Sequence, residues 1–144
     1  MTNHTKVIPF PVSQSALWRF FDYAGDIENW YRGLSEEGRD IFGSLLKANA
    51  KISVPLNWLG SKMLQGACKK EGIWEWCFRA DGVQQRLLGV FGKEPKTAIF
   101  LLGCSHKGKI YRPADCLETA IRRAKRAKNL SGAEFNARPI RTDL

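Results

Sequence analysis

The sequence predicts one α+β domain, and three observations support this. First, the 144 residues are 44% hydrophobic and include five tryptophans, which is enough for one hydrophobic core. Second, apolar residues repeat with helical spacing through residues 26–52, which predicts a pair of helices. Third, residues 73–104 contain strand-like runs separated by turn signals, which predicts antiparallel strands. We expect a single domain over residues 1–144, with its core at about 16–128.

The N-terminal part is predicted to be an irregular arm followed by a strand. Residues 1–15 contain Pro9 and Pro11, and proline neither donates a backbone hydrogen bond nor propagates a helix. Residues 17–23 (LWRFFDY) are rich in aromatic side chains, which favours a first strand.

A helical hairpin is predicted next. Asp26 can cap the first helix, whose apolar residues fall at i, i+3, i+4 and i+7. Ser35 can cap the second helix, and two glutamates in its first turn suit the helix dipole. Residues 53–72 contain a proline and three glycines and have no clear period, so we expect a long connection there.

Three strand-like runs predict an antiparallel meander. Residues 73–80 alternate in polarity, and Asp81-Gly82 after them is a strong signal for a type I′ hairpin turn. Residues 83–91 form the returning strand. Residues 97–104 are almost wholly apolar, which predicts a central strand buried on both faces.

Positive charge is concentrated near the C-terminus. The chain has a formal net charge of +9, and residues 105–128 hold eight basic residues against two acidic ones. Pro113 suits the first turn of a helix that carries most of these bases. Residues 129–144 are expected to form a flexible tail. Charge of this kind favours a polyanionic partner, namely RNA, DNA or an acidic protein.

The cysteines and the hydropathy argue against some classes of protein. No two of the four cysteines have C-x-x-C spacing, and there are only two histidines, so we expect no metal site. Reduced thiols are expected, with one disulfide as the alternative. No apolar run reaches the roughly 18–20 residues needed to cross a bilayer, and no secretory signal is visible. We therefore expect a cytoplasmic protein with no membrane partner.

Three segments carry a resemblance to a known family. They are IENWYRGLSEEGRDIF in the helical hairpin, EGIWEWCFRADGVQQRLLGVFG in the middle strands, and AIFLLGCSHKGKIYRPADCLETAIRRAKR in the last strand and helix. Together, over about residues 16–128, they resemble the RelE/ParE superfamily of toxins, and its phage-derived, HigB-like branch in particular. The resemblance implies a RelE-like fold: an N-terminal strand, a two-helix hairpin, an antiparallel three-stranded meander and a basic C-terminal helix.

The resemblance also implies a function. Members of the RNA-cleaving branch are the toxins of type II toxin–antitoxin systems. They are metal-free endoribonucleases (mRNA interferases) that inhibit translation by cutting mRNA, usually in the ribosomal A site. The implied partners are mRNA, the ribosome and a cognate antitoxin, a small helix-turn-helix protein, and no cofactor is implied. The alternative is a non-catalytic protein of the same fold, either a ParE-like inhibitor of DNA gyrase or a phage-derived binding protein.

Four residues are the catalytic candidates. By resemblance, Arg86 matches an arginine that contacts the scissile phosphate, and Tyr111 matches an aromatic residue that stacks on a base or assists proton transfer. His106 and Lys107 lie where members of the family place a basic catalytic residue. Histidine is also the side chain that ordinarily titrates near neutral pH, so His106 suits a general acid or base.

Five further basic residues are the candidates for RNA binding: Arg79, Lys109, Arg112, Arg122 and Arg126. One departure from the family pattern is Glu75, which stands where the best-studied members have a lysine. Each candidate also has a purely structural explanation. Arg86 can pair with an acid on a neighbouring strand, and His106 can be an ordinary exposed loop residue. Tyr111 can pack on the sheet, and the basic helix can be a solvated face.

Overall fold

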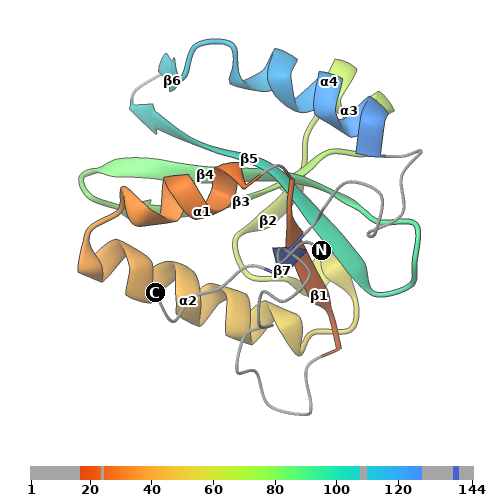
Figure 1. Cartoon of the computed structure of the whole chain (residues 1–144), viewed down its shortest axis with the longest axis horizontal. Coiled ribbons are helices and arrows are strands. Elements are labelled where there is room, and N and C mark those ends of the chain that lie inside the picture. The colour runs from red at the N-terminus through yellow and green to blue at the C-terminus, as the bar shows by residue number, and fades with distance from the viewer. Residues whose placement is uncertain (1–16, 24, 108–109, 128–137, 140–144) are drawn as a thin grey trace, which may run out of the picture.

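The computed structural model describes residues 17–23, 25–107, 110–127 and 138–139. Within these residues the strands form one mixed sheet of seven strands, in the order β2-β3-β4-β5-β1-β7, with β6 also paired to β5. Helices α1 and α2 lie on one face of the sheet, and α3 and α4 lie on the other (Figure 1). The fold is α+β, as the sequence predicts.

The bounds of the elements, in chain order, are β1 (Arg19–Asp22), α1 (Asp26–Arg32), α2 (Glu36–Ala50), the 3-10 turn η2 (Pro55–Asn57), β2 (Ser61–Met63), α3 (Ala67–Lys70), β3 (Trp74–Ala80), β4 (Val83–Phe91), β5 (Thr97–Lys107), β6 (Ile110–Arg112), α4 (Cys116–Ala127) and β7 (Arg138–Pro139). The predicted irregular arm and most of the predicted tail lie outside the described residues.

Both helices of the predicted hairpin form, but one of the two predicted caps is wrong. Ser35 caps α2, and its side chain accepts a hydrogen bond from the backbone N–H of Gly38 at 3.0 Å. Asp26 is not the cap of α1, because Gly25, with a φ of 82°, holds that position. The carboxylate of Asp22, at the end of β1, accepts hydrogen bonds at 3.0 Å from two backbone N–H groups of the first turn. The side chain of Asp22, from the preceding strand, therefore satisfies the N–H groups that a local cap would otherwise satisfy.

The prediction of a long connection over residues 53–72 is also wrong, because this segment holds η2, β2 and α3. β2 pairs antiparallel with β3, with Lys62 opposite Glu75. Gly60 permits this pairing, since a Cβ there would come within 2.8 Å of the carbonyl oxygen of Cys77. Elements of three or four residues are too short to show a hydrophobic period.

The antiparallel meander is confirmed. β3, β4 and β5 pair in sequence, and Asp81 and Gly82 have φ angles of 57° and 78°, as a type I′ turn requires. β5 extends to Lys107 rather than ending at residue 104. On its other edge β5 pairs in parallel with β1 and antiparallel with β6.

A β-bulge in β5 decides which face the candidate residues occupy. Two adjacent residues of β4 pair with Phe100 and Leu102, so Leu101 has no partner in β4. Phe100 packs on the side of α1 and α2, whereas Leu101 and Leu102 both pack on the side of α3 and α4. Every second residue after Leu102 keeps that side, which places His106 there as well. We call this side of the sheet the α4 face.

The two faces of the sheet carry different cores. On the α2 side the core is aromatic, and the ring of Trp58 lies edge-on to those of Trp74 and Trp76, with centroids 5.4 Å apart in each case. On the α4 face the core is mainly aliphatic, and α4 contributes small residues such as Ala120 and Ala124. None of the described helices combines the length and apolarity that a membrane crossing requires.

Candidate functional site

The candidate site lies on the part of the α4 face that α4 leaves uncovered. The helix begins at Cys116 and runs back along β5 with its alanines buried. Beyond the start of the helix, Gln84, Arg86 and His106 are half-buried and Arg79 is exposed. Polar and basic side chains therefore remain accessible on this end of the sheet.

One row of paired residues crosses this end of the sheet. Arg79 of β3 pairs with Gln84 of β4, which in turn pairs with His106 of β5. On its other edge His106 pairs with Tyr111 of β6. Adjacent strands lie about 4.8 Å apart, so the row spans about 14 Å. Strand pairing thus brings Arg79 into one row with two predicted site residues from a later part of the sequence, His106 and Tyr111.

Arg86, in the next row, forms an ion pair with Glu75. Its Nη1 lies 2.5 Å from Oε1 of Glu75, whose side chain is 0% exposed, while that of Arg86 is 14% exposed. Oε1 also lies 3.5 Å from Nζ of Lys62 and accepts a hydrogen bond from the thiol of Cys77 at 3.2 Å. The structural alternative for Arg86, an acid on a neighbouring strand, is therefore realised. The second terminal nitrogen of Arg86, Nη2, is not used by this ion pair and contacts another residue.

That partner is His106. Nη2 of Arg86 lies 3.4 Å from Nδ1 of His106. A guanidinium group only donates hydrogen bonds, so Nδ1 must accept, and the proton of the neutral imidazole then resides on Nε2. The chain Glu75–Arg86–His106 therefore determines which nitrogen of the ring can donate a proton.

The remaining basic candidates near His106 are placed by β6. Lys107 pairs with Ile110, and Arg112 pairs with Ser105, so both belong to the same end of β5. Lys109 lies outside the described residues.

Two of the RNA-binding candidates lie elsewhere. Arg122 and Arg126 are exposed on α4, six and ten residues after Cys116, which is about 9 and 15 Å along the helix. Together with Arg123 and Tyr23 they line a cavity of about 320 Å³. The predicted RNA contacts thus fall into two separate groups.

All four cysteines are free thiols that lie within electrostatic range of the buried Glu75. Burial, and then the hydrogen bond to Glu75, raises the pKa of Cys77 to about 11. The thiol of Cys104 donates to Cys116, which raises the pKa of Cys104 and lowers that of Cys116. No spacing in the sequence indicates that the four cysteines lie near Glu75.

In the part of the chain that the structure describes, no three potential ligand side chains are grouped to hold a metal ion.

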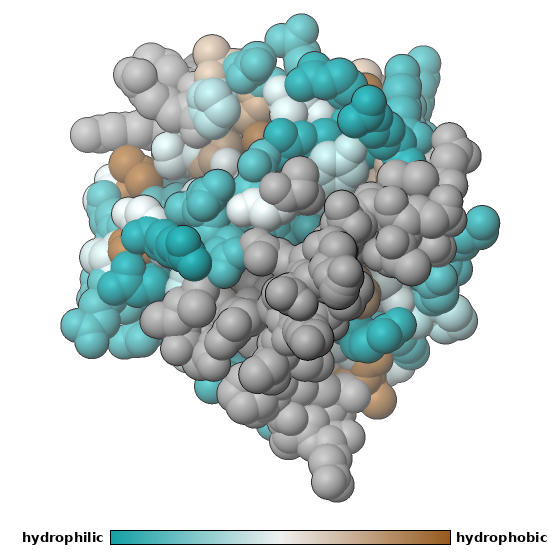
Figure 2. Space-filling model, in the orientation of Figure 1, coloured by the Kyte–Doolittle hydropathy of each residue, from teal (hydrophilic) through white to brown (hydrophobic). Residues whose placement is uncertain are grey.

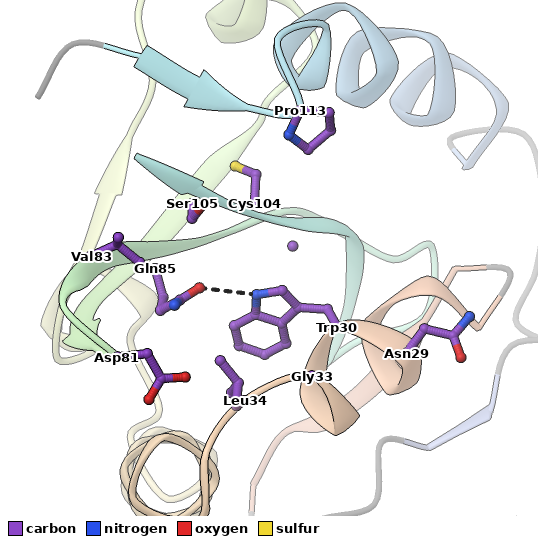
Figure 3. A pocket seen from close by; sticks show the side chains of 11 residues that line it. Asn29, Trp30, Gly33, Leu34, Asp81, Val83, Gln85, Cys104, Ser105 and Pro113 are labelled. Atoms are coloured by element: carbon purple, nitrogen blue, oxygen red, sulfur yellow. Dashed lines mark hydrogen bonds between the residues drawn. The ribbon is translucent and has the colours of Figure 1, made fainter. Parts of the chain in front are cut away.

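A further cavity, of about 410 Å³, lies between α1, the β3–β4 turn and the end of β5. Figure 3 shows the indole of Trp30 turned toward Gln85, and its Nε1 donates to Oε1 of Gln85 at 3.3 Å. Gly103 allows the indole to lie against the strand, because a Cβ there would come within 2.6 Å of the ring. No local signal in the sequence predicts this cavity, since its walls come from three separate elements.

Comparison of the chain with protein-family models, curated proteins and solved structures found no match.

Proposed function

We propose that the protein is the toxin of a toxin–antitoxin pair and cuts mRNA at the ribosome, by the metal-free chemistry that its resemblance implies. The observation that carries this proposal is the row Arg79–Gln84–His106–Tyr111, with Arg86 beside it, in which Arg79 is exposed and His106 is half-buried. Arginines that can meet phosphate oxygens stand next to a histidine that can donate a proton. The basic helix α4 adds a field that attracts a polyanion.

His106 suits the role of proton donor. In this type of cleavage the ribose 2′-oxygen loses a proton and attacks phosphorus, and the 5′-oxygen leaves and takes up a proton. In the free protein the hydrogen bond from Arg86 leaves the proton of the ring on Nε2. When Arg86 turns Nη2 to the phosphate, Nδ1 can take up a second proton, and the imidazolium then donates its Nε2 proton to the leaving 5′-oxygen. Arg79, which is exposed at the end of the same row, suits the negative charge that builds up on the phosphorane.

Glu75 suits positioning rather than proton transfer. Its side chain is fully buried and its Oε1 accepts from Arg86, so it does not reach a ribose hydroxyl. It holds Arg86 against His106 and thereby fixes the tautomer. The proton of the 2′-hydroxyl is then taken by the phenolate of Tyr111, which pairs with His106 across β5 and β6.

A non-catalytic binding protein, such as an inhibitor of DNA gyrase, is the second candidate. The observation that favours it is the ion pair between Glu75 and Arg86, because a guanidinium that neutralises a buried carboxylate has less charge to offer a phosphate. This function needs the basic surface of the protein and no proton donor.

Induction of the protein in cells, followed by primer-extension mapping of mRNA 5′ ends, tests the proposal. Wild type should create new ends, and His106→Gln should reduce their yield by about 100-fold, within the usual range for a general acid. Lys47→Gln, an exposed position on α2 behind the sheet, is the control and should cleave like wild type. Both variants need soluble expression equal to wild type.

Two results would overturn the proposal. A folded His106→Gln variant that cleaves like wild type would remove the histidine from the chemistry. A wild-type protein that leaves mRNA intact and induces the DNA-damage response would instead favour the gyrase inhibitor.

A further inference from the structure

Helix α4 carries a concave cluster of arginines away from the row of paired residues. Arg122, Arg123 and Arg126 lie with Tyr23 around the cavity of about 320 Å³, and none of the described residues that line it is acidic. Hydrophilic side chains gather at the upper right of Figure 2, where α4 runs in Figure 1. The cluster is a cavity rather than a flat charged surface, so it can surround a bound group.

Arg123 is held in place by three contacts. Its Nη1 lies 2.5 Å from Oδ2 of Asp26 and donates to the carbonyl oxygen of Leu101 at 2.7 Å. Its guanidinium carbon lies 5.4 Å from the centre of the Tyr23 ring. These contacts fix the side chain before any ligand arrives, which lowers the entropic cost of binding. Arg123 thus forms a rigid wall of the cavity.

Arg122 and Arg126 supply charge that no described carboxylate neutralises. They are four residues apart on the exposed side of α4, and like charges at that spacing oppose helix formation. Among the described residues, neither of them takes part in an ion pair. An anion in the cavity would relieve this repulsion, because each guanidinium offers a planar pair of donors to phosphate oxygens.

We propose that Arg122, Arg123 and Arg126 form a phosphate-binding subsite for single-stranded RNA, separate from the row that contains His106. The choice of RNA as the ligand rests on the proposed function. α4 starts against β5 beside Arg86 and carries the cluster about 9–15 Å further along. An RNA strand that lies over His106 can therefore place a phosphate a short distance along the strand into the cavity.

The test measures binding without cleavage. A fluorescein-labelled, single-stranded RNA with 2′-O-methyl groups cannot be cut through its 2′-oxygen, and its anisotropy reports binding by the full chain at several salt concentrations. The Arg122→Gln/Arg126→Gln variant should bind about 10-fold more weakly at 0.1 M salt. The slope of log K against log salt should fall in magnitude by about 0.7, since the variant loses one phosphate contact and each contact with single-stranded nucleic acid contributes about 0.7.

The control removes the same charge from another surface. Lys47→Gln/Lys51→Gln changes two exposed positions at the end of α2, on the opposite side of the sheet, and should leave the slope nearly unchanged. Equal losses in the two double variants would mean that only net charge matters, and no loss in either would remove the RNA contact. Either result overturns the subsite. The subsite would also be overturned if the cavity bound an acidic peptide while the arginine changes left the affinity for RNA unaltered.

This experiment separates the subsite from the proposed function. If wild type never cuts RNA but the arginine variant loses binding selectively, the subsite stands and the nuclease does not. If wild type cuts RNA while both double variants bind alike, the nuclease stands and the subsite does not.

Discussion

Replacing Arg86 should destabilise the fold far more than its position on the sheet suggests. The carboxylate of Glu75 is 0% exposed and depends on the guanidinium at 2.5 Å. Arg86→Met would leave that carboxylate buried without its main partner, and breaking a buried pair in this way costs about 3–5 kcal/mol. Nζ of Lys62 remains 3.5 Å away, on a side chain that is 63% exposed. This second cation keeps the expected loss near the lower bound, at about 3 kcal/mol.

The double variant Glu75→Leu/Arg86→Met should recover most of that loss. Replacing both members of a buried ion pair by apolar residues of similar volume is often neutral or stabilising. The double-mutant cycle should therefore give a coupling energy of at least about 2 kcal/mol, within the range seen for residues in direct contact.

Urea-induced unfolding, followed by tryptophan fluorescence, measures these differences, because Trp58, Trp74 and Trp76 are buried in one cluster. Arg79→Met, on the exposed end of the same face, is the matched control and should change the free energy of unfolding by at most about 0.5 kcal/mol. The reasoning fails if Arg86→Met costs less than about 1 kcal/mol, or if the double variant is less stable than Arg86→Met alone.

Three further predictions concern the glycines, an acid and the thiols. Gly89→Ala should cost about 1–3 kcal/mol in the same urea assay, because its Cβ would meet a tryptophan ring at 2.5 Å, whereas Gly33→Ala, with its nearest neighbour at 3.4 Å, should be tolerated. Hydrogen bonds from Ser35 lower the pKa of Asp81 in the folded protein. Such a carboxylate stabilises the fold at pH values above its pKa in the unfolded chain, and this stabilisation is lost as the pH falls through the folded pKa. Wild type should therefore lose stability relative to Asp81→Asn below about pH 3.8 in an acid titration of fluorescence, and parallel curves would contradict this. Because the pKa of Cys77 is about 11 and the other three thiols are buried, Ellman's reagent at pH 8 should label the native protein slowly and all four cysteines after unfolding.

The sequence could predict the elements whose signals are local. Ser35, the positive-φ turn at Asp81 and Gly82, and the alternating strand before that turn all act over a few residues. These features were predicted correctly because they depend on neighbours in the chain.

The features that the sequence could not show depend on contacts between distant segments. The carboxylate of Asp22 replaces the expected cap of α1 only because β1 ends beside the helix. β2 exists because it pairs with β3, and its three residues carry no period of their own. The pairing of Arg86 with both Glu75 and His106 requires three strands in register. At the candidate site, residue types could be chosen from the sequence, but their partners could not.

The bulge at Leu101 makes the length of β5 matter as much as its composition. Regular alternation counted forward from Phe100 would turn His106 toward α1 and α2, out of reach of Arg86. Removing Leu101 itself would leave a regular ladder with His106 still on the α4 face, since the flanking residues already pair with neighbours in β4. Removing a residue such as Ser105 would reverse the phase of the strand and separate His106 from its partner. Among single-residue deletions in β5, loss of Leu101 should therefore keep His106 on the α4 face, whereas loss of a residue between Leu101 and His106 should turn it to the other face, a contrast that substitutions alone cannot produce.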